Sequence, residues 1–191
     1  MQLVLGSSSP FRKQLLQQLD IEFITDSPDI DETPLKNESV EAMVLRLSVE
    51  KAREIAKRHT DSLVIGSDQS ALLNGMILHK PGNHETAVAQ LSSASGQTVV
   101  FQTGLCLYNS NNDTFQSKLV PFSVTFRSLT PSMIENYLRK EQPYNCAGSF
   151  KSEGLGIALF EKMQGNDPSA LIGLPLIELI NMLNHEGVSV L

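Results

Sequence analysis

The feature that most constrains the fold is the uninterrupted apolar run Leu63-Val64-Ile65-Gly66, followed at once by Ser67-Asp68. A strand with one solvent-exposed face alternates apolar and polar residues, so a continuous apolar run predicts a central strand covered on both faces. Asp68 then stands at the carboxyl end of that strand, the edge where α/β sheets place their ligands. The run therefore predicts an α/β fold with a carboxylate at the ligand edge.

The other patterns predict a mixed central sheet with flanking helices. Asn74-Gly75 between two apolar stretches predicts a tight hairpin, and the turn-rich segment 109–113 joins two long strands into an antiparallel hairpin. The remaining expected elements are strands at Leu3–Leu5 and Glu22–Thr25, the two hairpin strands Thr98–Tyr108 and Thr114–Phe126, and helices after Ser9, after Ser39, and at Glu85–Ala94, Pro131–Arg139, Pro168–Ile172 and Pro175–Glu186. This order lacks the strict alternation of an all-parallel fold. Because no repeat or Pro/Gly-rich linker interrupts it, we expect one domain over residues 1–191.

Composition excludes several classes of protein. Of the 191 residues, 41% are hydrophobic and 19% charged, which is typical of a globular chain, and the net charge of −6 argues against binding to polymeric nucleic acid. No apolar window is long enough for a membrane span, and the start of the chain lacks a signal peptide, so we expect cytoplasmic residence and no membrane partner. Cys106 and Cys146 have no metal or redox spacing, and Cys106 is expected to be a reduced core thiol.

The segment Gly6–Lys13 combines a strand end, three serines and a helix start. Ser9 followed by Pro10 predicts a capped helix whose free N–H groups and dipole favour an anion. Arg12 and Lys13 add charge in the first turn, where a cation is unfavourable unless an anion is present. The alternative is an ordinary capped helix with two solvated cations.

Carboxylates and isolated lysines are the other candidates. Asp68 suits a divalent metal or the acceptance of a proton from water, since Mg²⁺ favours one or two carboxylates with phosphate oxygens; a turn aspartate is the alternative. Lys51 and Lys80 suit phosphate, although isolated lysines are more often solvated. Glu32 is the favoured second metal or water ligand in the acidic loop Asp29–Pro34, although such loops are more often merely solvated. The histidines have no ligand spacing, and no acyl-transfer motif is present.

Together, these segments resemble the Maf family of nucleotide pyrophosphatases, which shares its architecture with the inosine-triphosphate pyrophosphatases. The resemblance covers the chain from end to end. The blocks that carry it are Ser7–Arg12, Asp31-Glu32-Thr33, Glu50-Lys51-Ala52, Gly66-Ser67-Asp68, Lys80-Pro81, Gly148–Gly154, Asp167-Pro168 and Gly173-Leu174-Pro175.

The resemblance implies roles for particular residues. It makes Asp68 the catalytic proton acceptor and, with Glu32, a ligand of a divalent cation, Mg²⁺ or Mn²⁺. The residues that it assigns to the substrate phosphates are Ser7, Arg12, Lys51 and Lys80.

The resemblance also implies a base. Phe11, Gln69 and Glu153 occupy positions where the branch acting on thymidine and uridine nucleotides has Arg, Thr and Gln, so this chain is similar to the branch specific for 7-methyl-GTP. That branch usually has tryptophan where this chain has Phe11.

The expected enzyme therefore hydrolyses 7-methyl-GTP to 7-methyl-GMP and pyrophosphate. The alternatives are a house-cleaning pyrophosphatase for other modified nucleotides and a non-catalytic nucleotide-binding regulator of cell division. The expected partner is a small-molecule nucleotide, and a homodimer stays open.

Overall fold

The structure, a computed structural model, describes residues 1–191. Its elements in chain order are β1 (Gln2–Gly6), α1 (Pro10–Gln17), β2 (Ile24–Asp26), α2 (Val40–Ala56), β3 (Ser62–Leu73), β4 (Met76–Leu78), α3 (His84–Ala94), β5 (Thr98–Asn109), β6 (Thr114–Phe126), α4 (Pro131–Glu141), the 3₁₀ turns η1 (Ala147–Ser149) and η2 (Leu155–Leu159), β7 (Phe160–Gly165), η3 (Pro168–Leu171) and α5 (Leu176–His185).

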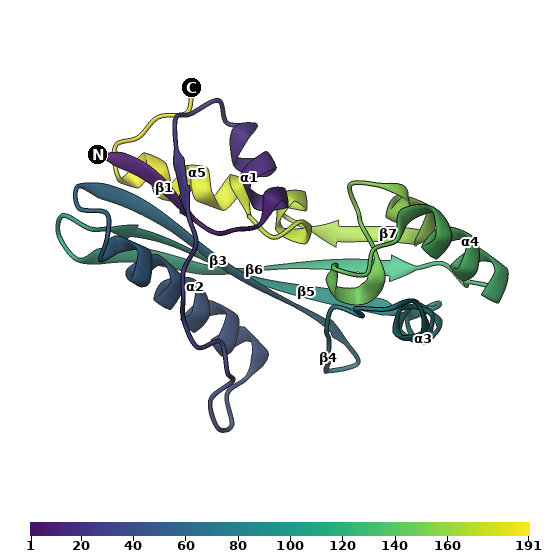
Figure 1. The fold of residues 1–191 in the computed structure, drawn as a ribbon. Helices are drawn as coiled ribbons and strands as arrows, with labels where there is room; N and C mark the ends of the chain where they lie inside the picture. Colours follow the sequence, from purple (N-terminus) through teal and green to yellow (C-terminus); the bar gives the residue numbers. More distant parts are fainter. The chain divides into compact units, whose positions relative to one another are not determined.

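The strands form a mixed sheet in the order β2-β1-β3-β5-β6-β7, with β4 paired to β3 (Figure 1). β1 is parallel to both β2 and β3, whereas the β3–β4 and β6–β7 pairs are antiparallel. The expected α/β fold with a mixed sheet is confirmed. The apolar run at 63–66 is the buried first half of β3, as predicted. Asp68, however, lies in the middle of this strand and not at its carboxyl end, because β3 continues to Leu73 and pairs there with β4.

The chain divides into two compact units. The first unit contains residues 1–69, 102–120 and 167–191, and the second contains residues 70–101 and 121–166. Whether they make one domain over residues 1–191 stays a prediction.

Within the first unit, helices cover both faces of the sheet at β1 and β3 (Figure 1). On one face, Ala52 and Ile55 of α2 pack against Val64 and Cys106. The other face packs against leucines of α1 and α5, including Leu16 and Leu179. Cys106 is a buried free thiol, as expected, and burial raises its pKa to about 12.

Within the second unit, four phenylalanines form an aromatic cluster. The Phe150 ring lies 5.5 Å from Phe101, 5.4 Å from Phe126 and 5.0 Å from Phe160, measured between centroids, and each pair is edge-to-face. Such pairs add specific geometry to apolar burial. The cluster fixes Phe150, the residue just before Lys151 and Glu153.

Hydroxyl side chains cap the starts of two helices. Ser39 Oγ accepts from Ala42 N at 3.2 Å at the start of α2, and Thr130 Oγ1 accepts from Met133 N at 3.3 Å at the start of α4. No helix of the chain combines the length and the apolar character that crossing a membrane requires.

Two expected elements differ from the prediction, and one strand was not predicted. The second strand is Ile24–Asp26 and not Glu22–Thr25, since pairing to β1 begins only at Val4↔Ile24. The helix expected at 168–172 is a single 3₁₀ turn. β7 was not predicted at all, because its residues after Phe160 are exposed and carry no apolar alternation; the strand forms by pairing with β6.

Candidate active site

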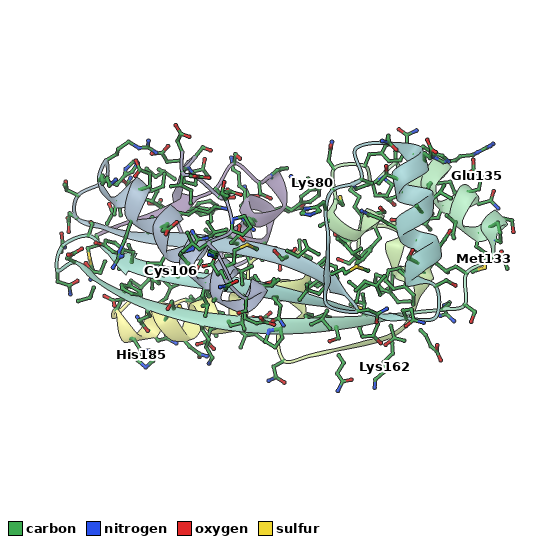
Figure 2. The ribbon with its side chains drawn as sticks, turned by 90° about the horizontal axis from the view of Figure 1, so that it is seen from below. Lys80, Cys106, Met133, Glu135, Lys162 and His185 are labelled. Atoms are coloured by element: carbon green, nitrogen blue, oxygen red, sulfur yellow. The ribbon has the colours of Figure 1, made fainter.

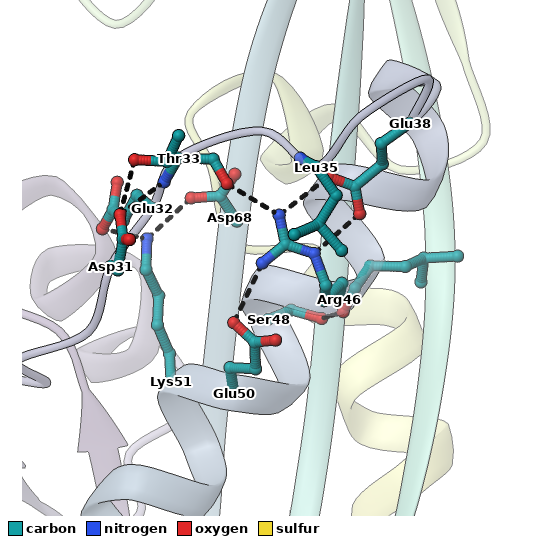
Figure 3. Close-up of polar contacts among 11 residues, drawn as sticks. Asp31, Glu32, Thr33, Leu35, Glu38, Arg46, Ser48, Glu50, Lys51 and Asp68 are labelled. Atoms are coloured by element: carbon teal, nitrogen blue, oxygen red, sulfur yellow. Dashed lines mark hydrogen bonds and ion pairs between the residues drawn. The ribbon is translucent and has the colours of Figure 1, made fainter.

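A buried lysine joins two carboxylates in the first unit (Figure 3). Lys51 Nζ lies 2.7 Å from Asp68 Oδ1 and 2.8 Å from Glu32 Oε1. The Lys51 and Asp68 side chains are 8% and 12% exposed, whereas Glu32 is 59% exposed. The structure thus brings together three of the predicted site residues, with Lys51 and Asp68 almost out of solvent.

A close approach of α2 to the sheet places Lys51 beside Asp68. A Cβ built on Gly66 would lie 2.1 Å from Ser48 O, and one on Gly104 would lie 2.2 Å from Val44 O. Both neighbours are backbone atoms of α2 that cannot move alone. Glycine at these two positions therefore lets the helix lie directly on β3 and β5.

The loop that carries Glu32 is held by Arg46, which the sequence did not single out. Arg46 donates to Glu38 from Nε at 2.6 Å and from Nη2 at 2.8 Å, to Glu50 at 3.0 Å and to Thr33 O at 3.3 Å (Figure 3). The Arg46 hydrogen bonds, with one from Leu35 N, lower the pKa of Glu38 to about 2. The i,i+4 spacing of Arg46 and Glu50 was a visible signal, but the link to Thr33 was not.

The predicted anion site at the start of α1 keeps hydrogen-bond donors that no other group of the protein accepts. Ser7 Oγ accepts from Ser9 N at 3.1 Å, and Ser9 Oγ accepts from Arg12 N at 3.4 Å. Both hydroxyls act here as acceptors, so each keeps its proton for an anion. Arg12 Nε donates to Gly173 O at 2.8 Å, and neither Nη nitrogen has a hydrogen-bond partner. Burial lowers the pKa of Arg12, and the charges of Asp68 and Glu32 oppose that shift, which places this cation among the same carboxylates.

The side-chain amide nitrogen of Gln69 is used in hydrogen bonds within the protein. Its Nε2 donates to Ala170 O at 2.6 Å, Thr103 Oγ1 at 3.0 Å and Leu171 O at 3.2 Å. An amide nitrogen has only two protons, so Oε1 is the atom of Gln69 left for a ligand. Phe11, the other predicted base residue of this unit, is half-buried on the first turn of α1.

Lys80 and Glu153 belong to the second unit. Lys80 is exposed in the connection between β4 and α3 (Figure 2). Burial raises the pKa of the Cys146 thiol, Glu153 adds to the rise, and Lys151 and Lys80 oppose it, so the charges of these groups act on one thiol. Ser149 has φ +65°, a strained conformation for a residue with a side chain, and strain of this kind clusters at functional sites.

The donor set fits a hard divalent cation of the kind that Mg²⁺ or Mn²⁺ represents. No group of three acidic, histidine or cysteine side chains is arranged as a complete metal cage. Asp68 and Glu32, however, converge on one cationic nitrogen. Mg²⁺ is commonly held by one or two carboxylates with waters and substrate phosphates, and this pair supplies that number of protein ligands.

Comparison with known proteins shows the family of the chain. The sequence model of the family described as Maf-like protein matches residues 2–186. The 7-methyl-GTP pyrophosphatase of Vibrio vulnificus (strain CMCP6) is 55% identical over 190 residues, which cover 100% of this chain and 97% of that protein. The proteins of the same name from Colwellia psychrerythraea (strain 34H) and Nitrosococcus oceani (strain ATCC 19707) are 52% and 54% identical, each over 99% of this chain and over 94% and 95% of their own lengths. The chain therefore belongs to the Maf family.

Proposed function

We propose that this protein is a nucleoside triphosphate pyrophosphatase that hydrolyses 7-methyl-GTP to 7-methyl-GMP and pyrophosphate. Family membership and the names of three relatives more than 50% identical support the reaction and the substrate. The observation that carries the proposal is the buried Lys51–Asp68 pair, with the Arg12 charge close enough to act on the same carboxylates. A protein that only binds a polyanion has no need of a carboxylate there.

The cations of the first unit suit the phosphates. A nucleoside triphosphate carries about four negative charges, and cleavage between the α and β phosphates builds more charge on the departing pyrophosphate. The two Nη groups of Arg12 and the hydroxyl of Ser7 have donors available, and Lys51 supplies a point charge. Lys80 is assigned to the phosphates on its Lys80-Pro81 motif.

Asp68 is assigned as the group that accepts the proton of the attacking water. Asp68 and Glu32 would also hold the divalent cation, Mg²⁺ or Mn²⁺. When bound, such a cation supplies positive charge to phosphate oxygens. Lys51 keeps the two carboxylates together by its ion pairs.

Recognition of the base is assigned to three residues. Methylation at N7 gives guanine a positive charge, and a Phe11 ring stacked on it would gain a cation–π energy of about 0.5–2 kcal/mol. The Glu153 carboxylate is an acceptor suited to the N1–H and N2–H donors together, which both guanine nucleotides present. Its negative charge also opposes the positive charge that only the methylated base carries. Gln69 can contribute only its Oε1 acceptor, since its amide protons are bonded within the protein.

The test is pyrophosphate release by the purified protein with Mg²⁺ from a panel that includes 7-methyl-GTP, GTP, UTP and dTTP. The expected kcat/KM for 7-methyl-GTP exceeds that for GTP by roughly 10- to 1,000-fold, from two terms of about 1–2 kcal/mol each. In the matched variants, Glu153→Gln loses most of this preference and Phe11→Trp keeps it. Equal kcat/KM for the two guanine nucleotides contradicts the substrate, and no release from any nucleotide contradicts the reaction.

Cytoplasmic residence and the absence of polymeric nucleic acid as a partner stay predictions, and a homodimer stays open.

A further inference from the structure

One backbone carbonyl receives two side chains of the first unit. Gly173 O accepts from Arg12 Nε at 2.8 Å and lies 2.9 Å from Ser67 Oγ, whose single proton is shared with Gly104 O at the same distance. Ser67 is 2% exposed, and Gly173 is buried. This carbonyl therefore ties a cation of the phosphate site to the residue next to Asp68.

The bond at Nε decides which way the Arg12 guanidinium faces. The guanidinium is planar and presents its donors in a fixed fork. With Nε held by Gly173 O, the two Nη groups are left without partners in the structure. Such a fork matches two phosphate oxygens, and its rotation is already restricted before an anion binds.

The conformation of Gly173 is one that a side chain would disturb. Its φ is +113°, outside the range that residues with a Cβ adopt readily. A Cβ there would also lie 3.3 Å from Arg12 Nε. Alanine at this position would act on the very group that the carbonyl holds.

A buried aspartate fixes the segment that presents Gly173. Asp167, 3% exposed, accepts from Ser169 N at 3.0 Å and from Ile177 N at 2.8 Å. Ser169 Oγ in turn accepts from Leu176 N at 2.7 Å. Pro175 gives α5 no side-chain cap, so Asp167 and Ser169 cap that helix from a distance and close the segment on itself.

We propose that Gly173 is a positioning residue of the anion site: its carbonyl, fixed by the Asp167–Ser169 clamp, holds the Arg12 guanidinium with both Nη groups facing the phosphates. This inference rests on the proposed function, which places phosphates at Arg12. It extends that function to a residue that touches no substrate.

The experiment is a double-mutant cycle that measures the affinity for inorganic pyrophosphate by calorimetry, with Mg²⁺ present throughout. Arg12→Ala should weaken binding by about 10- to 100-fold, the value of one or two charge-assisted hydrogen bonds. Gly173→Ala should weaken it by about 5- to 10-fold in the wild-type background and by less than about 2-fold in the Arg12→Ala background, because the two residues act as one unit.

Gly187→Ala is the matched control. Gly187 also has positive φ, at +77°, but no atom lies within 4 Å of a Cβ built on it. Thermal unfolding of both alanine variants separates the cost of backbone strain from the loss of affinity, and Gly187→Ala should bind pyrophosphate like the wild type.

Arg12→Lys keeps the test decisive if Gly173→Ala does not fold. Lysine retains the charge but loses the Nε–H bond to Gly173 O and the two Nη groups, so it should bind pyrophosphate more weakly than the wild type and more tightly than Arg12→Ala. Wild-type affinity in Arg12→Lys, an equal loss from Gly173→Ala in both backgrounds, or no binding of pyrophosphate by the wild type would each overturn the inference. Pyrophosphate binding without turnover of any nucleotide would contradict only the proposed function.

Discussion

Replacing Lys51 by methionine tests whether the Lys51–Asp68 pair stabilises the fold as well as serving the site. Methionine has a similar length and no charge, so the change removes the ammonium and largely keeps the packing. Asp68, 12% exposed, then loses its hydrogen-bonded partner, whereas Glu32, 59% exposed, regains water. The cost therefore falls on one buried carboxylate.

Removing one member of a buried pair costs about 3–5 kcal/mol. We expect the low end of this range, about 3 kcal/mol, because Asp68 keeps some solvent and the charge of Arg12 acts on it. Adding Asp68→Asn to Lys51→Met should restore about 1–2 kcal/mol of that loss, since an amide is cheaper to bury than an unpaired charge.

The assay is urea unfolding at pH 7 followed by circular dichroism. Lys57→Met is the matched control, because Lys57 lies at the end of the same helix and pairs with Glu54 at 2.6 Å with 69% of its side chain exposed. An exposed pair is worth about 0–1 kcal/mol, so this variant should unfold close to the wild type. A loss below about 1 kcal/mol in Lys51→Met, or one equal to that of the control, refutes the reasoning.

Three further outcomes are expected. Asp68→Asn should lower turnover by about 10²–10⁴-fold with an unchanged circular dichroism spectrum, and a tenth of wild-type activity would remove Asp68 from its proposed role. Excess chelator should abolish pyrophosphate release and Mg²⁺ or Mn²⁺ should restore it, since oxygen ligands suit hard cations; full activity in chelator contradicts the metal assignment. The pKa of the Glu38 carboxyl, measured by NMR titration, should be near 2 in the wild type and return toward 4.5 in Arg46→Gln. The Arg46–Glu38 link therefore stabilises the loop fully above about pH 4.5, and this stabilisation is lost as pH falls through about 2. A wild-type midpoint near 4.5 contradicts this expectation.

Much of the fold could be predicted because its signals are local. The apolar run of β3, the Asn74-Gly75 turn and the capping serines and threonines each act over a few residues. β7 could not be predicted in this way. Its only buried residue is Phe160, and the strand exists because β6 offers it a partner, which is a tertiary effect.

In the candidate site, too, residues with a local sequence signal could be predicted, and contacts that depend on tertiary structure could not. Asp68 stood out directly after an apolar run, although it lies inside β3 and not at its end, and the start of α1 had the pattern of an anion site. The link from Arg12 to Gly173 spans 161 positions, and no local pattern of Gly173-Leu174-Pro175 indicates which carbonyl will face an arginine. Arg46 was missed for the same reason, since its contact with Thr33 depends on the path of a loop.

The charge balance of the first unit gives a physical reason for a divalent cation. Arg12 and Lys51 supply two positive charges, and Glu32 and Asp68 supply two negative ones, so this group is formally neutral. Directed hydrogen bonds from Arg12 and Ser7 can orient phosphates, but a neutral group has little attraction for an anion of about four charges, least of all at physiological salt. The two carboxylates that cancel the positive charge of Arg12 and Lys51 are also the hard ligands that a divalent cation requires. Removal of the metal should therefore weaken binding of the triphosphate itself, beyond its effect on the chemical step.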